Sequence, residues 1–180
     1  LAMPSRVPLL AICSTGGTGA GPARPKGSAR AWAGGRYPTD PLESNAPRVS
    51  IVMPAFNEAL VIESSVTEVL RAMRDRGEQF ELIIAENGST DGTQPIAAAL
   101  AAAQPEVRLL SLPEADYGRA LRAGFLAAQG DLVVNFDADY YDVPFVDRAR
   151  AAMSASPPPV IVVGSKRGEG SDDTRAWSRR

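Results

Sequence analysis

The chain contains no histidine and a single cysteine, Cys13, among its 180 residues. The lack of histidine excludes imidazole-based triads, histidine general bases and the usual zinc sites within this chain. One cysteine cannot form an internal disulfide, and this favours a reducing, cytoplasmic compartment. Long hydrophobic runs are missing too. The longest unbroken one, residues 96–103, is too short to span a bilayer, so we expect no transmembrane helix.

Charge of one sign is not in large excess, because 19 basic and 21 acidic residues give a net charge of −2. Residues 1–48 hold six basic and two acidic residues, which leaves thirteen of the 19 basic and nineteen of the 21 acidic residues for the rest of the chain. A nucleic-acid-binding domain would show a clustered basic face, so no nucleic-acid partner is expected. An acidic domain that binds an anionic substrate would use a metal ion to offset the like charges.

Residues 1–48 also hold seven of the 15 prolines and seven of the 16 glycines, without a sustained period of either kind. We expect them to form a disordered, basic extension. A glycine loop at residues 15–21 follows an apolar stretch, but Pro22 and Pro25 stand where a dinucleotide-binding motif needs a helix. Residues 49–180 are expected to form one domain, which we interpret as incomplete because the chain stops at Arg180 without a closing signal.

From Val49 onward, apolar runs alternate with segments of helical periodicity. The runs predict strands at residues 49–53, 80–85, 107–110, 132–136 and 160–163. Helices are predicted from an Asn57 cap to Gly77 and at residues 95–103, 117–129 and 144–153. Strands that are apolar throughout and alternate with helices indicate an α/β fold with a Rossmann-like, mostly parallel sheet covered by helices on both faces.

Polar clusters follow four of these strands, and ligands of parallel sheets bind beyond the carboxyl ends of the strands. The clusters are residues 54–58, 86–91, 137–142 and 166–167. In the third cluster, Asp137-Ala138-Asp139 ends a buried strand; if the chain is still extended there, both carboxylates point to the same side. Hard cations such as Mg²⁺ or Mn²⁺ prefer carboxylate oxygens. We therefore predict a divalent metal site with Asp137 and Asp139 as ligands.

Three segments, VSIVMPAFNE (49–58), ENGSTDGT (86–93) and Asp137-Ala138-Asp139, together resemble the family 2 glycosyltransferases of GT-A fold. Within that family the likeness is greatest to the polyprenyl-phosphate (dolichol-phosphate) sugar transferases. The resemblance implies a nucleotide-diphosphate-sugar donor, GDP- or UDP-linked, with the Phe56 ring beside its base or ribose and Glu58 accepting hydrogen bonds from it. Asp137 and Asp139 are the implied catalytic residues. The implied donor-binding residues are Pro54, Ala55, Phe56, Glu58, Glu86, Asn87, Asp137, Ala138 and Lys166.

The chain departs from the family pattern at three positions. Asn87 stands where an aspartate often faces the base, so the identity of the base stays open. Tyr141 replaces a side-chain amide near the metal, which leaves the third ligand open with Asp142 as a candidate. Lys166 replaces an arginine and lacks its bidentate geometry. Asp116 and Tyr117 are predicted either to line the sugar pocket or to cap the next helix.

The function implied is transfer of a sugar, with inversion, to a polyprenyl phosphate at the inner face of a membrane. Such an acceptor is already an anion and needs no strong general base. A nucleotidyltransferase is one alternative, although residues 54–58 offer neither the glycine nor the positive charge of its usual loop. A receiver-like signalling module would want an acidic pair after the first strand, where this chain has Asn57-Glu58. The remaining alternative is a nucleotide-binding fragment without turnover.

Overall fold

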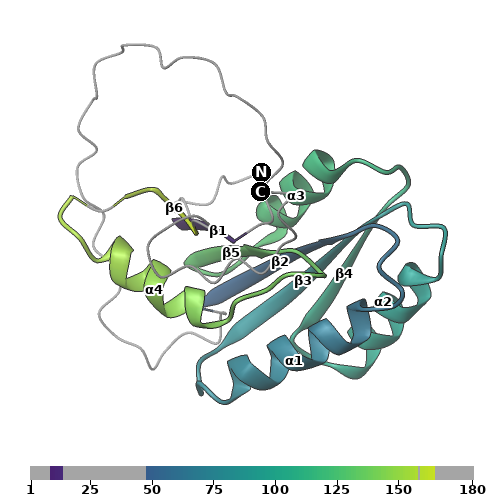
Figure 1. Ribbon diagram of the computed structural model, residues 1–180, viewed down its shortest axis with the longest axis horizontal. Coiled ribbons are helices and arrows are strands. Elements are labelled where there is room, and N and C mark those ends of the chain that lie inside the picture. Colours follow the sequence, from purple (N-terminus) through teal and green to yellow (C-terminus); the bar gives the residue numbers. More distant parts are fainter. Residues whose placement is uncertain (1–8, 14–47, 158, 165–180) are drawn as a thin grey trace, which may run out of the picture. The chain divides into compact units, whose positions relative to one another are not determined.

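Strands and helices alternate along the described chain. The computed structural model describes residues 9–13, 48–157 and 159–164. All of them belong to one of the two units of the chain, and this unit comprises both Leu1–Thr15 and Ala46–Arg180. The elements are β1 (Leu9–Cys13), β2 (Val49–Ala55), α1 (Ile62–Arg74), β3 (Phe80–Asn87), α2 (Thr93–Ala103), β4 (Val107–Leu112), α3 (Tyr117–Ala127), β5 (Leu132–Phe136), α4 (Pro144–Met153) and β6 (Ile161–Val163) (Figure 1).

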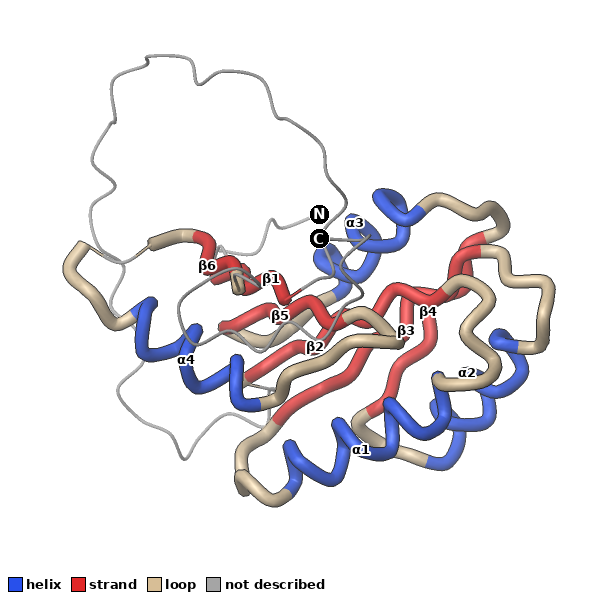
Figure 2. The backbone as a smooth tube through the Cα atoms, in the orientation of Figure 1, coloured by secondary structure: helices blue, strands red, loops and turns tan. Residues whose placement is uncertain are grey.

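The strands form a single parallel sheet with the order β4-β3-β2-β5-β1-β6 (Figure 2). This confirms the predicted α/β fold. Strand β2 extends two residues beyond its predicted end at residue 53 and includes Pro54 and Ala55. The pairing of β2 with β5 stops at Val52, whereas its pairing with β3 continues to Ala55. Proline has no backbone N–H to donate, so it is tolerated where the strand has only one partner.

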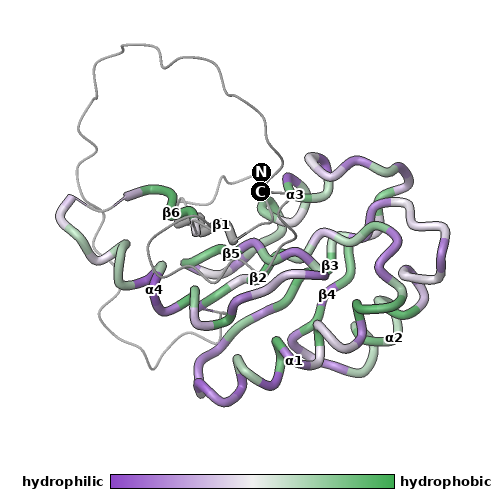
Figure 3. Tube along the Cα trace, viewed as in Figure 1, coloured by the Kyte–Doolittle hydropathy of each residue, from purple (hydrophilic) through white to green (hydrophobic). Residues whose placement is uncertain are grey.

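Helices cover both faces of the sheet. On one face, alternate residues of β2, β3 and β5 pack with α1, α2 and α4 into one hydrophobic cluster. Ile51, Met53 and Phe136 are among its largest fully buried side chains, and each such side chain contributes about 1.5–3 kcal/mol on burial. Figure 3 shows the same pattern, with hydrophobic colour in the strands and hydrophilic colour in several connecting loops.

Helix α3 covers the other face, over β2 and β3. It approaches the sheet closely at Gly124, where an added Cβ would lie 2.3 Å from Val52 Cγ1. No other residue fits at this distance without displacing Val52. The close approach brings the first turn of α3, which begins at Tyr117, to the carboxyl ends of the strands.

Strand β1 differs from the flexible extension expected for residues 1–48. Its backbone pairs with β5, from Leu9 opposite Leu132, and with β6, from Leu10 opposite Ile161. The sequence LLAIC is uniformly apolar and can occupy an edge that β5 would otherwise leave unpaired. Residues 1–8 and 14–47 lie outside the described residues.

Candidate functional site

Three of the four predicted polar clusters meet at the carboxyl edge of the sheet. The loop after β2 contacts the loop after β3, and the first residue of α3 contacts the turn after β5. The fourth cluster, which contains Lys166, lies outside the described residues. The adjacency of β2, β3 and β5 in the sheet explains why segments so distant in sequence converge.

The loops after β2 and β3 are joined by hydrogen bonds. Three consecutive backbone amides of the first loop donate to side chains of the second: Asn57 N to Ser89 Oγ at 3.0 Å, Glu58 N to Thr93 Oγ1 at 2.8 Å and Ala59 N to Asp91 Oδ2 at 3.1 Å. The segment GSTDGT therefore acts as a scaffold for the segment that follows β2.

Asn57 is part of this scaffold and does not cap α1 as predicted. It adopts a left-handed backbone conformation with φ 58°, which asparagine tolerates better than most residues. Its side-chain oxygen accepts from the Thr90 amide at 2.8 Å. Helix α1 starts later, at Ile62, and Val61 at its N-cap offers no side-chain hydrogen bond. Asp91 accepts from the Thr93 amide at 3.0 Å at the start of α2, where the N-cap position itself is Gly92.

Glu86 and Asn87 are both buried, with exposed fractions of 2% and 3%. The Asn87 amide donates to the Ala55 carbonyl at 3.0 Å and accepts from the Asp116 amide at 3.2 Å. Glu86 accepts from the Ser89 amide at 2.6 Å. Both residues thus hold neighbouring backbone in place. The sequence analysis predicted that they bind the donor; in the structure both polar atoms of the Asn87 amide, and Oε1 of Glu86, have partners within the protein.

Asp137 and Asp139 lie in a tight turn, and the extended geometry considered from the sequence is wrong here. Strand β5 ends at Phe136, and Asp137 and Tyr140 then exchange two backbone hydrogen bonds of 3.1 Å each. The turn makes the two carboxylates unequal, because Asp137 is only 8% exposed while Asp139 lies on the surface. Asp139 forms no ion pair with any other residue that the structure describes.

The sequence analysis missed Asn135 as a site residue and left Tyr117 between lining the sugar pocket and capping the next helix. The Tyr117 hydroxyl donates to Asp137 Oδ1 at 2.9 Å, while Asp116 caps α3 by accepting from the Arg119 amide at 2.9 Å. Burial, followed by the charge of Asp137, raises the pKa of Tyr117 to about 12. Asn135 is fully buried, and within the described part of the chain neither polar atom of its side-chain amide has a hydrogen-bond partner. A polar residue inside an apolar strand was the signal that could have found it.

Negative charge concentrates around Glu58. Burial raises the pKa of Glu58, and the charges of Asp139, Asp91 and Asp137 raise it further. Such a cluster is suited to a divalent cation. No group of three or more His, Cys, Asp or Glu residues in the described part of the chain is arranged to hold a metal ion. Two carboxylates completed by substrate phosphates are a common way to bind Mg²⁺, so the residues present fit such an ion.

Tyr141 and Asp142, the positions tied to the open third ligand, have partners elsewhere. The Tyr141 hydroxyl donates to Glu68 on α1, and Asp142 pairs with Arg148 on α4. Asp142, the candidate third ligand, is therefore engaged in an ion pair. At the end of β2, Pro54 and Ala55 are buried, whereas Phe56, the next residue, is 44% exposed. The exposed and half-buried donor-binding candidates in the described chain are Phe56 and Glu58, and the predicted metal ligand Asp139 is exposed as well.

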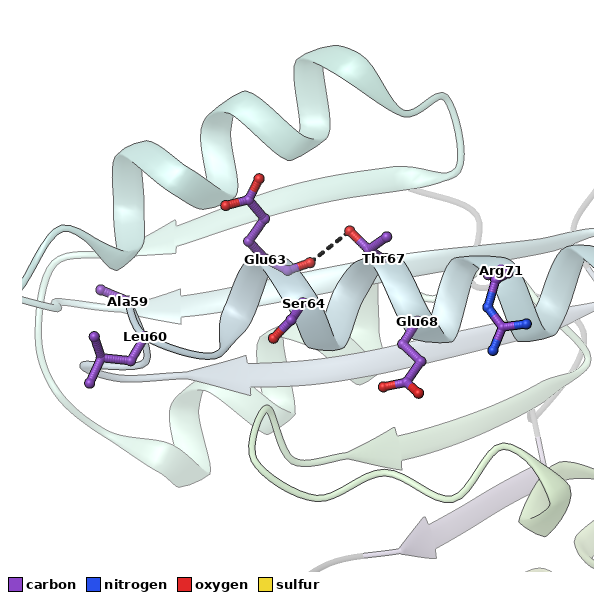
Figure 4. A pocket seen from close by; sticks show the side chains of 7 residues that line it. All are labelled: Ala59, Leu60, Glu63, Ser64, Thr67, Glu68 and Arg71. Atoms are coloured by element: carbon purple, nitrogen blue, oxygen red, sulfur yellow. Dashed lines mark hydrogen bonds between the residues drawn. The ribbon is translucent and has the colours of Figure 1, made fainter.

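An open hollow of about 540 Å³ runs along α1 (Figure 4). It is lined by Ala59, Leu60, Glu63, Ser64, Thr67, Glu68 and Arg71. In Figure 4, Glu63 and Thr67 lie on one side of the helix and Ser64 and Glu68 on the other. The polar side chains that line the hollow therefore do not point toward one another. This hollow includes none of the predicted site residues.

The fold and the carboxylate turn define a GT-A-like, Rossmann-like domain of the glycosyltransferase class. The family model described as "Glycosyl transferase family 2" matches residues 50–180. The chain therefore belongs to the family 2 glycosyltransferases, as the three motifs indicated.

Similar proteins include an undecaprenyl-phosphate 4-deoxy-4-formamido-L-arabinose transferase of Pseudomonas aeruginosa, 33% identical over 142 residues that cover 73% of this chain and 38% of that protein. Glycosyltransferase AglD of Haloferax volcanii is 40% identical over 94 residues, 51% of this chain and 15% of that protein. The chain thus spans well under half the length of the relatives it matches.

Among solved structures, the mannosyltransferase PcManGT from Pyrobaculum calidifontis, in complex with GDP-Man and Mn²⁺, is similar with a TM-score of 0.51 and 27% identity. The likeness covers 61% of this chain and 33% of that one. None of the helices that the structure describes is both long and apolar enough to cross a bilayer.

Proposed function

We propose that this chain binds a nucleotide-diphosphate sugar and provides the donor half of a glycosyl transfer reaction. The observation that carries the proposal is the convergence of Glu58, Asp137 and Asp139 at the carboxyl edge of the sheet, where ligands of such sheets bind. Membership of family 2 and the likeness to a structure holding GDP-Man and Mn²⁺ support it.

In this proposal the exposed ring of Phe56 packs on the base or ribose, and Glu58 accepts hydrogen bonds from the nucleotide. Asp137 and Asp139 hold Mg²⁺ or Mn²⁺, which when bound stabilises the charge that grows on the diphosphate leaving group. Pro54, Ala55 and Ala138 shape the pocket through backbone position, because their side chains are buried. Glu86 and Asn87 act by fixing the loops around the nucleotide.

The acceptor in this proposal is a polyprenyl phosphate, consistent with the undecaprenyl-phosphate transferases among the relatives. A phosphate acceptor is already ionised, so the reaction needs no strong base on the protein. The absence of histidine from the chain is then no obstacle. A lipid acceptor also places the reaction at a membrane surface.

The test is calorimetric titration of GDP, UDP, GDP-mannose and UDP-glucose into the protein, with Mn²⁺ and with a chelator. We expect one nucleotide to bind with Mn²⁺ and to lose at least about tenfold in affinity in the Asp139→Asn variant. Asp75→Asn is the matched control, because Asp75 is the C-cap of α1 and, among the described residues, its side chain forms only an exposed pair with Arg71. A folded chain that binds no nucleotide under either condition would refute the donor site.

A further inference from the structure

The side chain of Asp137 is held by an element other than the one that carries it. Its backbone belongs to the turn that closes on Tyr140, while its Oδ1 accepts from the Tyr117 hydroxyl at 2.9 Å. Tyr117 is the first residue of α3 and lies 20 residues before Asp137 in the sequence. Backbone and side chain of this aspartate therefore have separate anchors.

The position of Tyr117 is itself fixed. Asp116 accepts from the Arg119 amide at the first turn of α3, and its own amide donates to Asn87 at the end of β3. Asn87 in turn donates to the Ala55 carbonyl at the end of β2. Hydrogen bonds thus tie Asp116, the residue before Tyr117, to the ends of β2 and β3. The Tyr117 ring is 51% exposed, so packing alone does not explain its orientation.

We propose that Tyr117 is a positioning residue that sets the rotation of the Asp137 carboxylate for a divalent cation. The inference rests on the proposed function, because it assigns Asp137 to that cation. A hydrogen bond to one carboxylate oxygen restricts rotation about the Cβ–Cγ bond and so aims the other oxygen. Partners of this kind orient the ligands of many metal sites. Asp139, which is exposed, has no matching anchor among the described residues.

The buried Asn135 is an independent observation that the residues around Asp137 do more than pack. Its side-chain amide is fully buried and has no hydrogen-bond partner among the residues that the structure describes, a costly arrangement that native proteins rarely keep without a reason. It stands two residues before Asp137 in the chain, in the last part of β5.

The experiment measures free Mn²⁺ by electron paramagnetic resonance while Mn²⁺ is titrated into the protein with GDP and, separately, with UDP. The Tyr117→Phe variant removes only the hydroxyl and keeps the ring. Tyr141→Phe is the matched control, since it also removes a phenol that donates to a carboxylate, that of Glu68 on α1. We expect Tyr117→Phe to raise the dissociation constant for Mn²⁺ about tenfold, and Tyr141→Phe to leave it unchanged.

Thermal unfolding in chelator completes the test, with both variants expected within about 4 °C of the unmodified protein. Equal Mn²⁺ affinity in Tyr117→Phe and the unmodified protein would overturn the positioning role alone. A melting temperature for Tyr117→Phe far below that of Tyr141→Phe would also overturn it, because the hydroxyl would then be holding the fold together. If the unmodified protein binds neither Mn²⁺ nor nucleotide, the donor site fails and this inference fails with it.

Discussion

Replacing Glu81 with alanine should destabilise the fold strongly without touching the candidate site. Glu81 is 5% exposed at the amino end of β3 and accepts from Ser50 Oγ at 2.6 Å and from the Gln129 amide at 2.7 Å. Its other oxygen pairs with Arg108 at 2.6 Å, and Arg108 also donates to the carbonyl of Ala127. The carboxylate therefore connects the segment that follows α3 with the strands β2, β3 and β4.

The expected loss follows from these contacts. A buried hydrogen bond to a charged group contributes about 1.5–3 kcal/mol, and Glu81→Ala removes two of them. The Arg108 side chain is 39% exposed, so water replaces much of its lost partner and we add little for that pair. Removing the carboxylate also relieves its own desolvation cost. We therefore expect the free energy of unfolding to fall by about 3 kcal/mol.

Urea unfolding followed by far-ultraviolet circular dichroism measures this change. Glu114→Ala is the control, because Glu114 pairs with Arg119 while both side chains are exposed, at 73% and 62%. It should cost less than about 1 kcal/mol. Nucleotide affinity of folded Glu81→Ala should match that of the unmodified protein, since the cluster lies at the opposite edge of the sheet from the site. A loss for Glu81→Ala as small as that for Glu114→Ala would refute the reasoning.

Two further predictions concern the same scaffold. Gly130→Ala should lower the free energy of unfolding by about 1–3 kcal/mol, because its Cβ would lie 2.7 Å from the Ser50 amide nitrogen; Gly118→Ala, with 3.5 Å to its nearest neighbour, should cost nothing in the same urea assay. The Thr93 hydroxyl, followed by the amides of Ala59 and Thr93, lowers the pKa of Asp91 below 3.8. The stabilisation is therefore present above that pH and lost as pH falls through the folded pKa, so Asp91→Asn should flatten the stability curve as pH falls below 3.8; parallel curves would contradict this.

The sequence predicted the architecture well where local pattern decides structure. Helix α4 occupies residues 144–153 as expected, with a proline at its start and helical spacing throughout. The uniformly apolar strands of the parallel sheet were also recognised, because burial on both faces leaves a pattern that needs no tertiary information. The convergence of the motif loops followed from the rule that parallel strands end at one edge.

The details of the site depend on contacts between segments that are distant in the sequence, and a local sequence pattern does not predict such contacts. Asn57 resembles a helix cap in sequence, but Ser89 and Thr90 draw it into a cross-loop network. The turn at Asp137 depends on its pairing with Tyr140, and the partnership with Tyr117 depends on how closely α3 approaches the sheet at Gly124. None of these contacts is marked by a periodic pattern in the sequence.

The hydrogen bonds between the loops after β2 and β3 also have a thermodynamic meaning. Binding loops usually lose conformational entropy when a ligand orders them, and that loss weakens affinity. Here the amides of residues 57–59 already have partners within the protein. They should exchange their hydrogens with solvent slowly even without ligand. A nucleotide that meets this surface would find a rigid frame, so selection among bases would depend on fit rather than on the folding of a loop around whichever base arrives.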